Sequence, residues 1–280
     1  MAEIENAGGG PSDAAGGHLR SLHARRAIAG AGVETGTPPH GGTLTVTPPA
    51  AAGRGADITI ALIIPALNEP LLGPAVQRLG SLKPDEMVVV HTGDPVSLNS
   101  LRNAPAPPGM RVLEAARGRA LQMNHGAAIA GADVLLFLHA DTELPPHALD
   151  AVRRAIHAGA LWGFFSVRIA GRHPLLRVVE RLMNLRSRLT GIATGDQALF
   201  VRRDVFQLIG GYARIALMED IELCARLKWF GRPARLAAAV VTSARRWEAR
   251  GVLRTIVRMW CLRGLYALGV SPQRLARWYG

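Results

Sequence analysis

The amino-acid sequence predicts an α/β protein with a parallel, Rossmann-like sheet, and two observations indicate this class. Between residues 57 and 140, short apolar or β-branched runs alternate with segments whose apolar residues recur at helical spacing. Strands that alternate with helices in this way usually pair in parallel, with the helices covering the sheet. The expected strands are 58–64, 86–91, 110–115 and 133–140, and the expected helices are 71–82 and 118–132.

The second half of the chain is less regular but still mixes strands and helices. We expect strands at 163–169, 198–203 and 235–244, and helices at 174–189, 219–231 and 250–268. The helix over 219–231 is expected to end at a glycine. A short terminal helix is expected from Ser271, with Pro272 at its first position.

The composition divides the chain into three parts. Residues 1–56 are rich in Gly, Ala, Pro and Thr without periodicity, so we expect a disordered N-terminal extension that carries no secretory signal. We expect one domain over 57–249 and an amphipathic helical segment over 250–280. No run of about 18 uncharged apolar residues predicts a membrane-spanning helix. Cys224 and Cys261 have no metal-binding spacing and are expected as thiols in a reducing, cytoplasmic compartment.

The charge is concentrated in the second half. The 280 residues carry 33 Lys and Arg against 21 Asp and Glu, a formal net charge of +12. Residues 1–167 hold 12 basic and 14 acidic residues, whereas residues 168–280 hold 21 and 7. This asymmetry indicates an anionic partner, which includes phosphates, nucleic acid and an acidic membrane. We expect no nucleic-acid partner, because no recognised nucleic-acid-binding motif is present. All Lys and Arg residues other than Lys83 and Lys228 are arginines. A compositional bias explains this excess of arginine as well as a phosphate partner does.

The helix expected over 250–268 has the pattern of a membrane-surface helix. Arg250, Arg254 and Arg258 form one stripe, and Ile256, Met259 and Trp260 lie roughly opposite. Such a helix suits peripheral contact with the inner face of an anionic membrane. The alternative is a helix packed on the preceding domain.

Polar residues follow two of the expected strands, at the edge where α/β sheets bind ligands. Asn68 and Glu69 in PALNE (65–69) suit hydrogen bonds to a ribose or a base, or else form a polar turn. Asp141 in HADTE (139–143) offers the oxygen ligand that Mg²⁺ or Mn²⁺ prefers, or else starts the following helix.

Two later motifs also carry chemical groups. Asp220 in MED (218–220) lies at a helix N-terminus, where it can be a general base or simply a capping residue. Arg245, Arg246 and Trp247 follow the last strand. The guanidinium groups suit a leaving diphosphate and the indole suits a sugar or base, although a solvated basic loop is the alternative.

Taken in order, these motifs resemble glycosyltransferase family 2 over residues 58–280. The resemblance is strongest to a small bacterial subgroup with GRAxQMNxGA, LHADT, GDQALFVRR, MEDIEL and TSARRWE. It implies a GT-A fold: a Rossmann-like nucleotide-binding half, a mixed central β-sheet with helices on both faces, and basic C-terminal helices. It also implies a nucleotide-sugar donor (a UDP- or GDP-sugar), a divalent metal such as Mg²⁺ or Mn²⁺, and inversion at the anomeric carbon in one displacement.

The resemblance also implies roles for individual residues. Asp220 would be the general base, Arg246 and Trp247 would act near the diphosphate and acceptor, and Asp141 would bind the metal in a DXD-like motif. The donor site would comprise Pro65, Asn68, Glu69, Arg119, Asn124, His139 and Asp141. The acceptor and donor-sugar site would comprise Gly195, Asp196, Gln197 and Glu219. A lipid-linked acceptor suits the basic half, and a saccharide or small-molecule acceptor is equally compatible.

Two positions depart from the family pattern. His91 stands where an acidic residue usually ends the second strand, and His139 stands where the DXD-like motif usually begins with Asp. These departures leave an alternative open, which is a non-catalytic nucleotide-sugar-binding or scaffold protein on the same fold.

Overall fold

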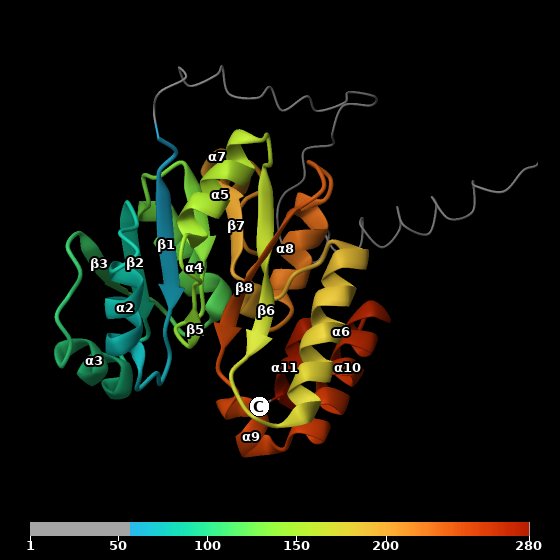
Figure 1. The fold of residues 1–280 in the computed structure, drawn as a ribbon. Helices are drawn as coiled ribbons and strands as arrows, with labels where there is room; N and C mark the ends of the chain where they lie inside the picture. The colour runs from blue at the N-terminus through green and yellow to red at the C-terminus, as the bar shows by residue number, and fades with distance from the viewer. Residues whose placement is uncertain (1–56, 280) are drawn as a thin grey trace, which may run out of the picture. The chain divides into compact units, whose positions relative to one another are not determined.

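A computed structural model describes residues 57–279, apart from the side chains of Arg246, Ala249 and Arg250. The disorder expected over residues 1–56 therefore lies outside the described residues. In the described part, eight strands form one sheet in the order β3-β2-β1-β4-β7-β6-β8-β5 (Figure 1). The strands are β1 (Ile60–Pro65), β2 (Glu86–His91), β3 (Met110–Glu114), β4 (Val134–Phe137), β5 (Thr142–Glu143), β6 (Trp162–Ile169), β7 (Leu199–Arg202) and β8 (Ala234–Thr242).

The sheet is mixed. Strands β3, β2, β1 and β4 are parallel, with Ile63 between Val88 on β2 and Phe137 on β4. Strand β7 is antiparallel to both β4 and β6, and β6 is parallel to β8. The first half therefore pairs in parallel as the alternation predicted, and the mixed central sheet is confirmed.

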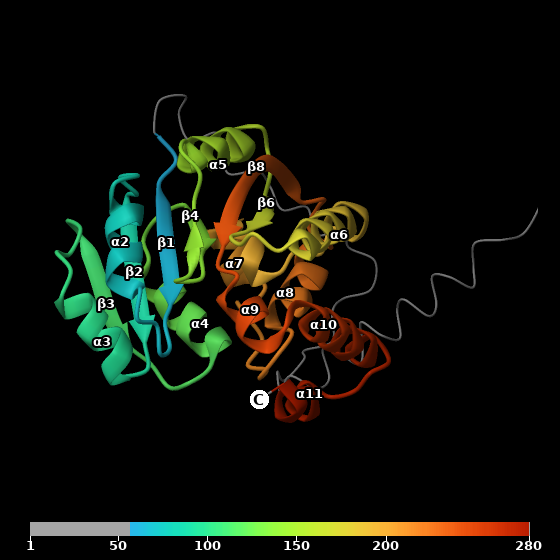
Figure 2. The same cartoon turned by 60° about the horizontal axis from the view of Figure 1, so that its bottom comes forward.

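Helices cover both faces of the sheet (Figures 1 and 2). The strand β1 is buried along its whole length, and its alternate residues enter two hydrophobic clusters. On one face, Leu62 shares a cluster with residues of α2 (Leu72–Gly80) and α5 (Ala148–His157). On the other face, Ile63 shares a cluster with α4 (Arg119–Ile129), α7 (Arg203–Leu208) and α8 (Glu219–Leu227).

One glycine sets the distance between α4 and the sheet. A Cβ atom on Gly126 would lie 2.7 Å from Cγ2 of Ile63, so no larger residue fits without moving the helix. The close approach matters for function, because α4 begins at the carboxyl-end edge of the sheet.

Several short elements were not expected from the sequence. They are α3 (Pro95–Arg102), α7, α9 (Arg245–Arg250), the 3₁₀ turn η1 (Gly195–Gln197) and the strand β5. A local signal for α3 exists, because Asp94 caps the Ser97 N–H at 2.8 Å and Pro95 occupies the first position. The helix α8 ends at Leu227, so the expected end at Gly231 is wrong.

The C-terminal helices α6 (Pro174–Thr190), α10 (Val252–Ala267) and α11 (Pro272–Tyr279) pack against the rest of the described chain. Ile256 joins a cluster with α6, and Met259 joins a cluster with Met218 and Leu275. The apolar stripe expected to face a membrane is therefore divided, because Ile256 and Met259 are partly buried in these clusters whereas Trp260 is exposed. Among the described residues, no helix has the length and apolar character needed to cross a bilayer.

Candidate functional site

Five charged or polar residues from four separate elements form a charged cluster. They are Arg119 at the start of α4, His139 after β4, Asp196 in η1, and Glu219 and Asp220 at the start of α8. Arg119 Nη1 lies 3.1 Å from Glu219 Oε1, and His139 Nδ1 lies 3.4 Å from Asp196 Oδ1. The cluster therefore unites motifs that lie far apart in the sequence.

Asp220 is held by the turn that precedes β7. Its Oδ2 accepts a hydrogen bond from the Gly195 backbone N–H at 2.8 Å. Burial and the neighbouring Glu219 raise the pKa of Asp220 from 3.8 to about 6, against the opposing effects of Arg119, His139 and the Gly195 hydrogen bond. A carboxylate with such a pKa can take up a proton near neutral pH.

Glu219 is committed to a different partner. Its side chain is buried and pairs with Arg119, which is itself partly exposed. Burial opposes the charge on Arg119, but Glu219, Asp220 and Asp196 together raise the pKa of the guanidinium. Met218, just before this pair, has φ 70°, an uncommon conformation for a non-glycine residue. The sharp turn it makes directs adjacent carboxylates to different partners.

His139 and Gly195 are in tight contact. A Cβ on Gly195 would lie 2.2 Å from His139 Nε2 and 3.0 Å from Asp220 Oδ2. The Nε2 atom is buried and has no hydrogen-bond partner within the part of the chain that the structure describes. An unsatisfied buried nitrogen is costly, and its presence beside a carboxylate is typical of a binding site.

Asp141 lies two residues beyond His139 and is half-buried. Its backbone carbonyl accepts a hydrogen bond from the Ser243 N–H at 3.2 Å, next to the pairing of β5 with β8. Within residues 57–279, no three His, Cys, Asp or Glu side chains converge as a metal-binding group. A lone carboxylate fits Mg²⁺-type binding in which substrate phosphates and water supply the remaining ligands.

The predicted nucleotide-binding motif lies at the ends of β1 and β2. Pro65 ends β1, and the Glu69 N–H donates to Ser97 Oγ at 3.0 Å. Asn68 has φ 51°, and its backbone N–H helps to lower the pKa of Asp94. Glu69 Oε1 lies 2.5 Å from Arg245 Nη2, so α9 reaches back to this motif.

Helix α4 ties this edge together through two amides. Gln122 donates from Nε2 to the carbonyls of Ala66 and Val90, at 2.8 and 2.7 Å, just past β1 and near the end of β2. Asn124 Nδ2 donates to the Tyr212 carbonyl at 2.8 Å, and Asn124 Oδ1 accepts a hydrogen bond from the Tyr212 N–H at 2.9 Å. Sequence reasoning missed Gln122, whose only signal was a polar residue on the apolar side of a helix.

Two further predicted residues also have structural partners. The buried Gln197 side chain donates to Ser187 Oγ at 2.9 Å and to the Phe165 carbonyl at 3.3 Å. Trp247 packs against the cluster between α6 and α10. The side chain of Arg246 lies outside the described residues.

Replacing Gln122 by Leu is expected to lower the free energy of unfolding by about 1–3 kcal/mol. The buried Ala66 carbonyl would lose its side-chain donor, and an unmet buried acceptor costs about that much. Urea unfolding followed by fluorescence measures the change. The exposed Gln207→Leu is the control and should stay within about 0.5 kcal/mol of wild type; equal values for both variants would contradict the assignment.

The family is decided by a sequence match that extends from β1 to β7. Residues 61–207, just over half of the chain, match the sequence model of the family described as Glycosyl transferase family 2. The chain belongs to glycosyl transferase family 2. It is therefore a glycosyltransferase, and its mixed sheet with helices on both faces is the GT-A fold.

Two solved structures resemble this glycosyltransferase. Residues 1–349 of TarS from S. aureus align with a TM-score of 0.50 and 16% identity, covering 67% of this chain and 61% of that one. The mannosyltransferase PcManGT from Pyrobaculum calidifontis, in complex with GDP-Man and Mn²⁺, aligns with a TM-score of 0.53 and 19% identity. That alignment covers 94% of this chain and 77% of the mannosyltransferase. At these identities the likeness concerns the fold, and no curated protein matches the sequence significantly.

Proposed function

We propose that this glycosyltransferase moves a sugar from a nucleoside-diphosphate donor to an acceptor hydroxyl with inversion, and that Asp220 is the general base. The observation that carries the proposal is the position of the Asp220 carboxylate, fixed by the Gly195 N–H and raised in pKa. In a single displacement the acceptor oxygen bonds to the anomeric carbon as the bond to the diphosphate breaks. The hydroxyl proton passes to the base, so one carboxylate is sufficient.

Glu219 has a positioning role in this proposal. Its pairing with Arg119 leaves Asp220 as the carboxylate that receives the proton. Asp196 and His139 belong to the same cluster and would hold the donor sugar, with His139 Nε2 available to accept a hydrogen bond.

Positive groups would stabilise the departing diphosphate. Charge grows on this group in the transition state, so arginines near it lower the barrier. Arg119, Arg245 and Arg246 are our candidates. Asp141 would hold a divalent metal together with the donor phosphates, and the metal would supply further neutralisation of charge. The bound Mn²⁺ and GDP-Man of the mannosyltransferase support a metal and a nucleotide sugar for this chain.

The nucleoside would lie over the ends of β1 and β2, against Pro65, Asn68 and Glu69. In this scheme Asn124 and Gln197 are positioning residues, because their amides bond neighbouring protein groups. Trp247 would bring α9 and the adjacent Arg246 toward the diphosphate through its packing between α6 and α10.

A thermal-shift screen of UDP- and GDP-sugars with and without Mn²⁺ tests this function. A cognate donor at about 100 times its Kd should stabilise the protein by about 2.7 kcal/mol. The Asp141→Asn variant should lose the part of the shift that depends on Mn²⁺, whereas the exposed Asp150→Asn should retain it. The proposal would be contradicted if, with metal present, none of these donors stabilised the protein and the protein hydrolysed none of them.

A further inference from the structure

Helix α6 presents a row of apolar side chains to solvent. The row recurs at intervals of three and four residues, so its members share one face. Their exposed fractions run from 39% to 77%, and they are Leu175, Val178, Leu182, Leu185 and Leu189. Leu176 and Val179 lie on another face and pack into the protein.

Helix α10 carries a second exposed row beside the first. Leu253, Val257 and Trp260 lie on α10 and Leu268 follows its last residue, and the four are between 54% and 82% exposed. The two helices are in contact (Figures 1 and 2). The first turns of both helices enter the same cluster, through Leu176 and Val179 on α6 and Val252 and Ile256 on α10. The two helices therefore run in the same direction. On each helix the exposed row lies about 100° around the axis from the packed residues, at ~100° per residue, and in opposite senses, so both rows lie on the same side of the pair. We call the two rows the apolar face.

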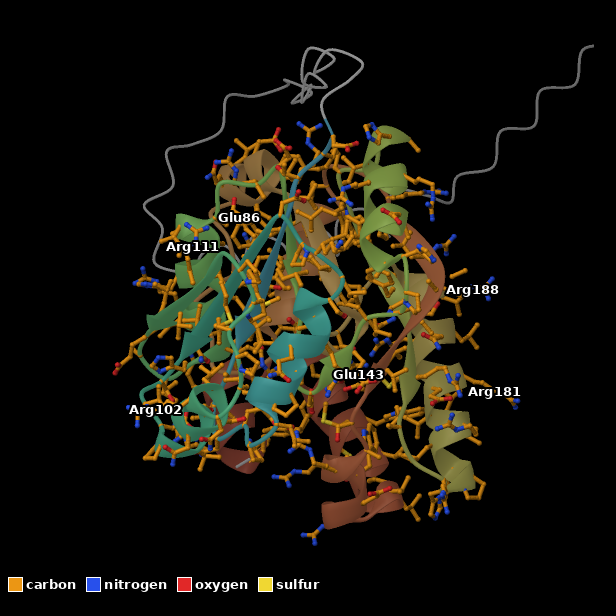
Figure 3. The ribbon with its side chains drawn as sticks, turned by 60° about the vertical axis from the view of Figure 1, so that its left-hand side comes forward. Glu86, Arg102, Arg111, Glu143, Arg181 and Arg188 are labelled. Atoms are coloured by element: carbon orange, nitrogen blue, oxygen red, sulfur yellow. The ribbon has the colours of Figure 1, made fainter. Side chains whose placement is uncertain are left out.

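Arginines are numerous on these two helices, with little acid to balance them; Arg181, Arg188 and Arg254 are exposed, whereas Arg186 and Arg263 are half-buried. The two helices contain Arg177, Arg181, Arg186, Arg188, Arg254, Arg258 and Arg263, and one acidic residue, Glu180. Glu180 is buried and lies 3.0 Å from Arg177. Arg181 and Arg188 extend away from the ribbon (Figure 3).

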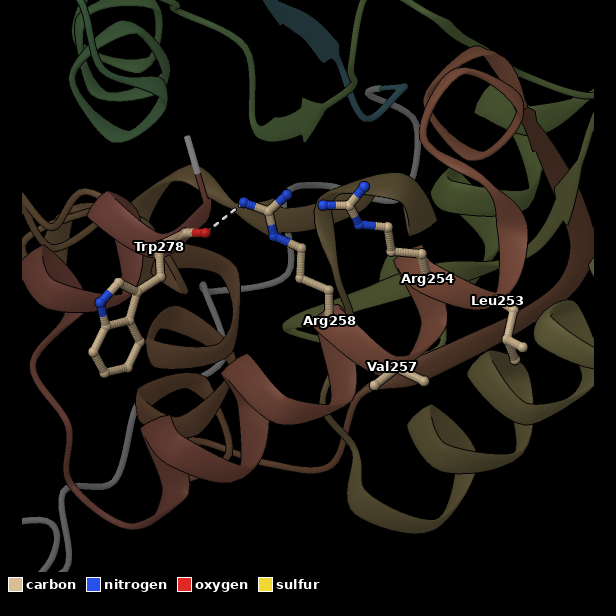
Figure 4. Close-up of a pocket in the computed structure, with 5 residues that line it drawn as sticks. All are labelled: Leu253, Arg254, Val257, Arg258 and Trp278. Carbon is tan, nitrogen blue, oxygen red and sulfur yellow. Dashed lines mark hydrogen bonds between the residues drawn. The ribbon is translucent and has the colours of Figure 1, made fainter.

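An open groove of about 900 Å³ joins the apolar face to two of these arginines. It is lined by Leu253, Arg254, Val257, Arg258 and Trp278. Figure 4 shows the guanidinium groups of Arg254 and Arg258 directed to one side of α10, with Leu253 and Val257 on the other. Arg258 donates to the Trp278 carbonyl and lies over the Tyr279 ring, so the exposed Arg254 is the guanidinium that suits a phosphate at the border of this apolar surface.

We propose that the apolar face docks on the surface of a bilayer that contains anionic lipids. The apolar rows would enter the boundary between headgroups and acyl chains, and the exposed Arg181, Arg188 and Arg254 would contact lipid phosphates. The spacing on α6 also suits a helix of a second copy. In that arrangement, however, arginine-rich helices would face each other without exposed acid on either, whereas anionic lipids supply the opposite charge. The proposal does not depend on the catalytic scheme, since lipid binding is measured without donor.

Co-sedimentation with vesicles tests the proposal on the full chain. Wild type should bind phosphatidylcholine vesicles that contain phosphatidylglycerol, bind phosphatidylcholine alone at least about tenfold more weakly, and lose binding as salt rises. The double variant Leu182→Glu with Val257→Glu should bind anionic vesicles at least about tenfold more weakly. The double variant Leu208→Glu with Val112→Glu is the matched control and should bind like wild type, because it adds the same two carboxylates at residues that are 63% and 42% exposed outside the apolar face.

Other outcomes overturn the proposal. Absence of wild-type binding to anionic vesicles would do so, as would equal binding by the double variant and wild type. If sedimentation velocity shows a dimer that Leu182→Glu dissociates, and vesicles do not bind, the apolar face belongs to a second copy. Circular dichroism verifies that each variant is folded. A second double variant, Arg181→Gln with Arg188→Gln, changes no apolar residue and should also bind anionic vesicles more weakly than wild type.

Discussion

Replacing Asp220 by Asn is expected to reduce turnover of the cognate nucleotide sugar by about 10²- to 10⁴-fold, the usual contribution of a general base. The amide oxygen of Asn can still accept the Gly195 hydrogen bond, so the site should keep its geometry. The donor should therefore bind nearly as tightly as to wild type. Steady-state turnover and donor titration measure the two effects separately.

Asp204→Asn is the control for Asp220→Asn. Asp204 is an exposed carboxylate on α7 that pairs with Arg202, outside the charged cluster. The Asp204→Asn variant should turn over the donor at the wild-type rate. If the Asp220→Asn variant also turned over the donor at that rate, Asp220 would not be the base.

The raised pKa of Asp220 gives this prediction a pH signature. Turnover should fall as pH drops through about 6, because the protonated carboxyl cannot accept a proton. Stability should change in the opposite direction. A carboxyl whose pKa is higher in the folded than in the unfolded protein favours folding at low pH, and this contribution is lost as pH rises from 3.8 through about 6. Asp220→Asn should therefore be at least as stable as wild type at pH 7, which a purely structural role would not predict.

Replacing Gly195 by Ala is expected to reduce turnover by about 10²-fold, the loss that a displacement of about 1 Å can produce at a reacting centre. The added Cβ would lie 2.2 Å from His139 Nε2 and 3.0 Å from Asp220 Oδ2. The His139 ring is mostly buried, so it cannot turn away without moving its neighbours. Because alanine keeps the backbone N–H, the effect isolates the position of the two side chains from the hydrogen bond.

Gly264→Ala controls for the general effect of adding a methyl group. A Cβ at this position of α10 meets no atom of the described residues within 4 Å. Alanine in a helix interior should stabilise the protein by about 0.5–1 kcal/mol and leave turnover unchanged. Equal turnover by Gly195→Ala and wild type would show that the contact with His139 has no part in catalysis.

The fold was largely predictable because its signals are local. The apolar run at 86–91 predicts β2 with the bounds that the structure has, and helices on both faces follow from the alternation. Helix α3 was missed because Ser97 is its one buried residue, so it has almost no apolar pattern. The exposed face of α10 differs from the expected one because Ile256, Met259 and Trp260 look alike in the sequence, whereas packing partly buries Ile256 and Met259 and leaves Trp260 exposed.

For the charged cluster, the sequence predicts which residues take part, and the tertiary structure decides which of them pair. The residue types that follow each strand can be inferred from the chain alone, because strand ends and turns are set by local pattern. Long-range packing was needed to join Arg119 to Glu219 across 100 residues and Arg245 to Glu69 across 176. Glu219 and Asp220 are neighbours with almost the same chemistry. The turn at Met218 and the packing of α4 and η1 decide that one carboxylate is bound by an arginine and the other is left to titrate.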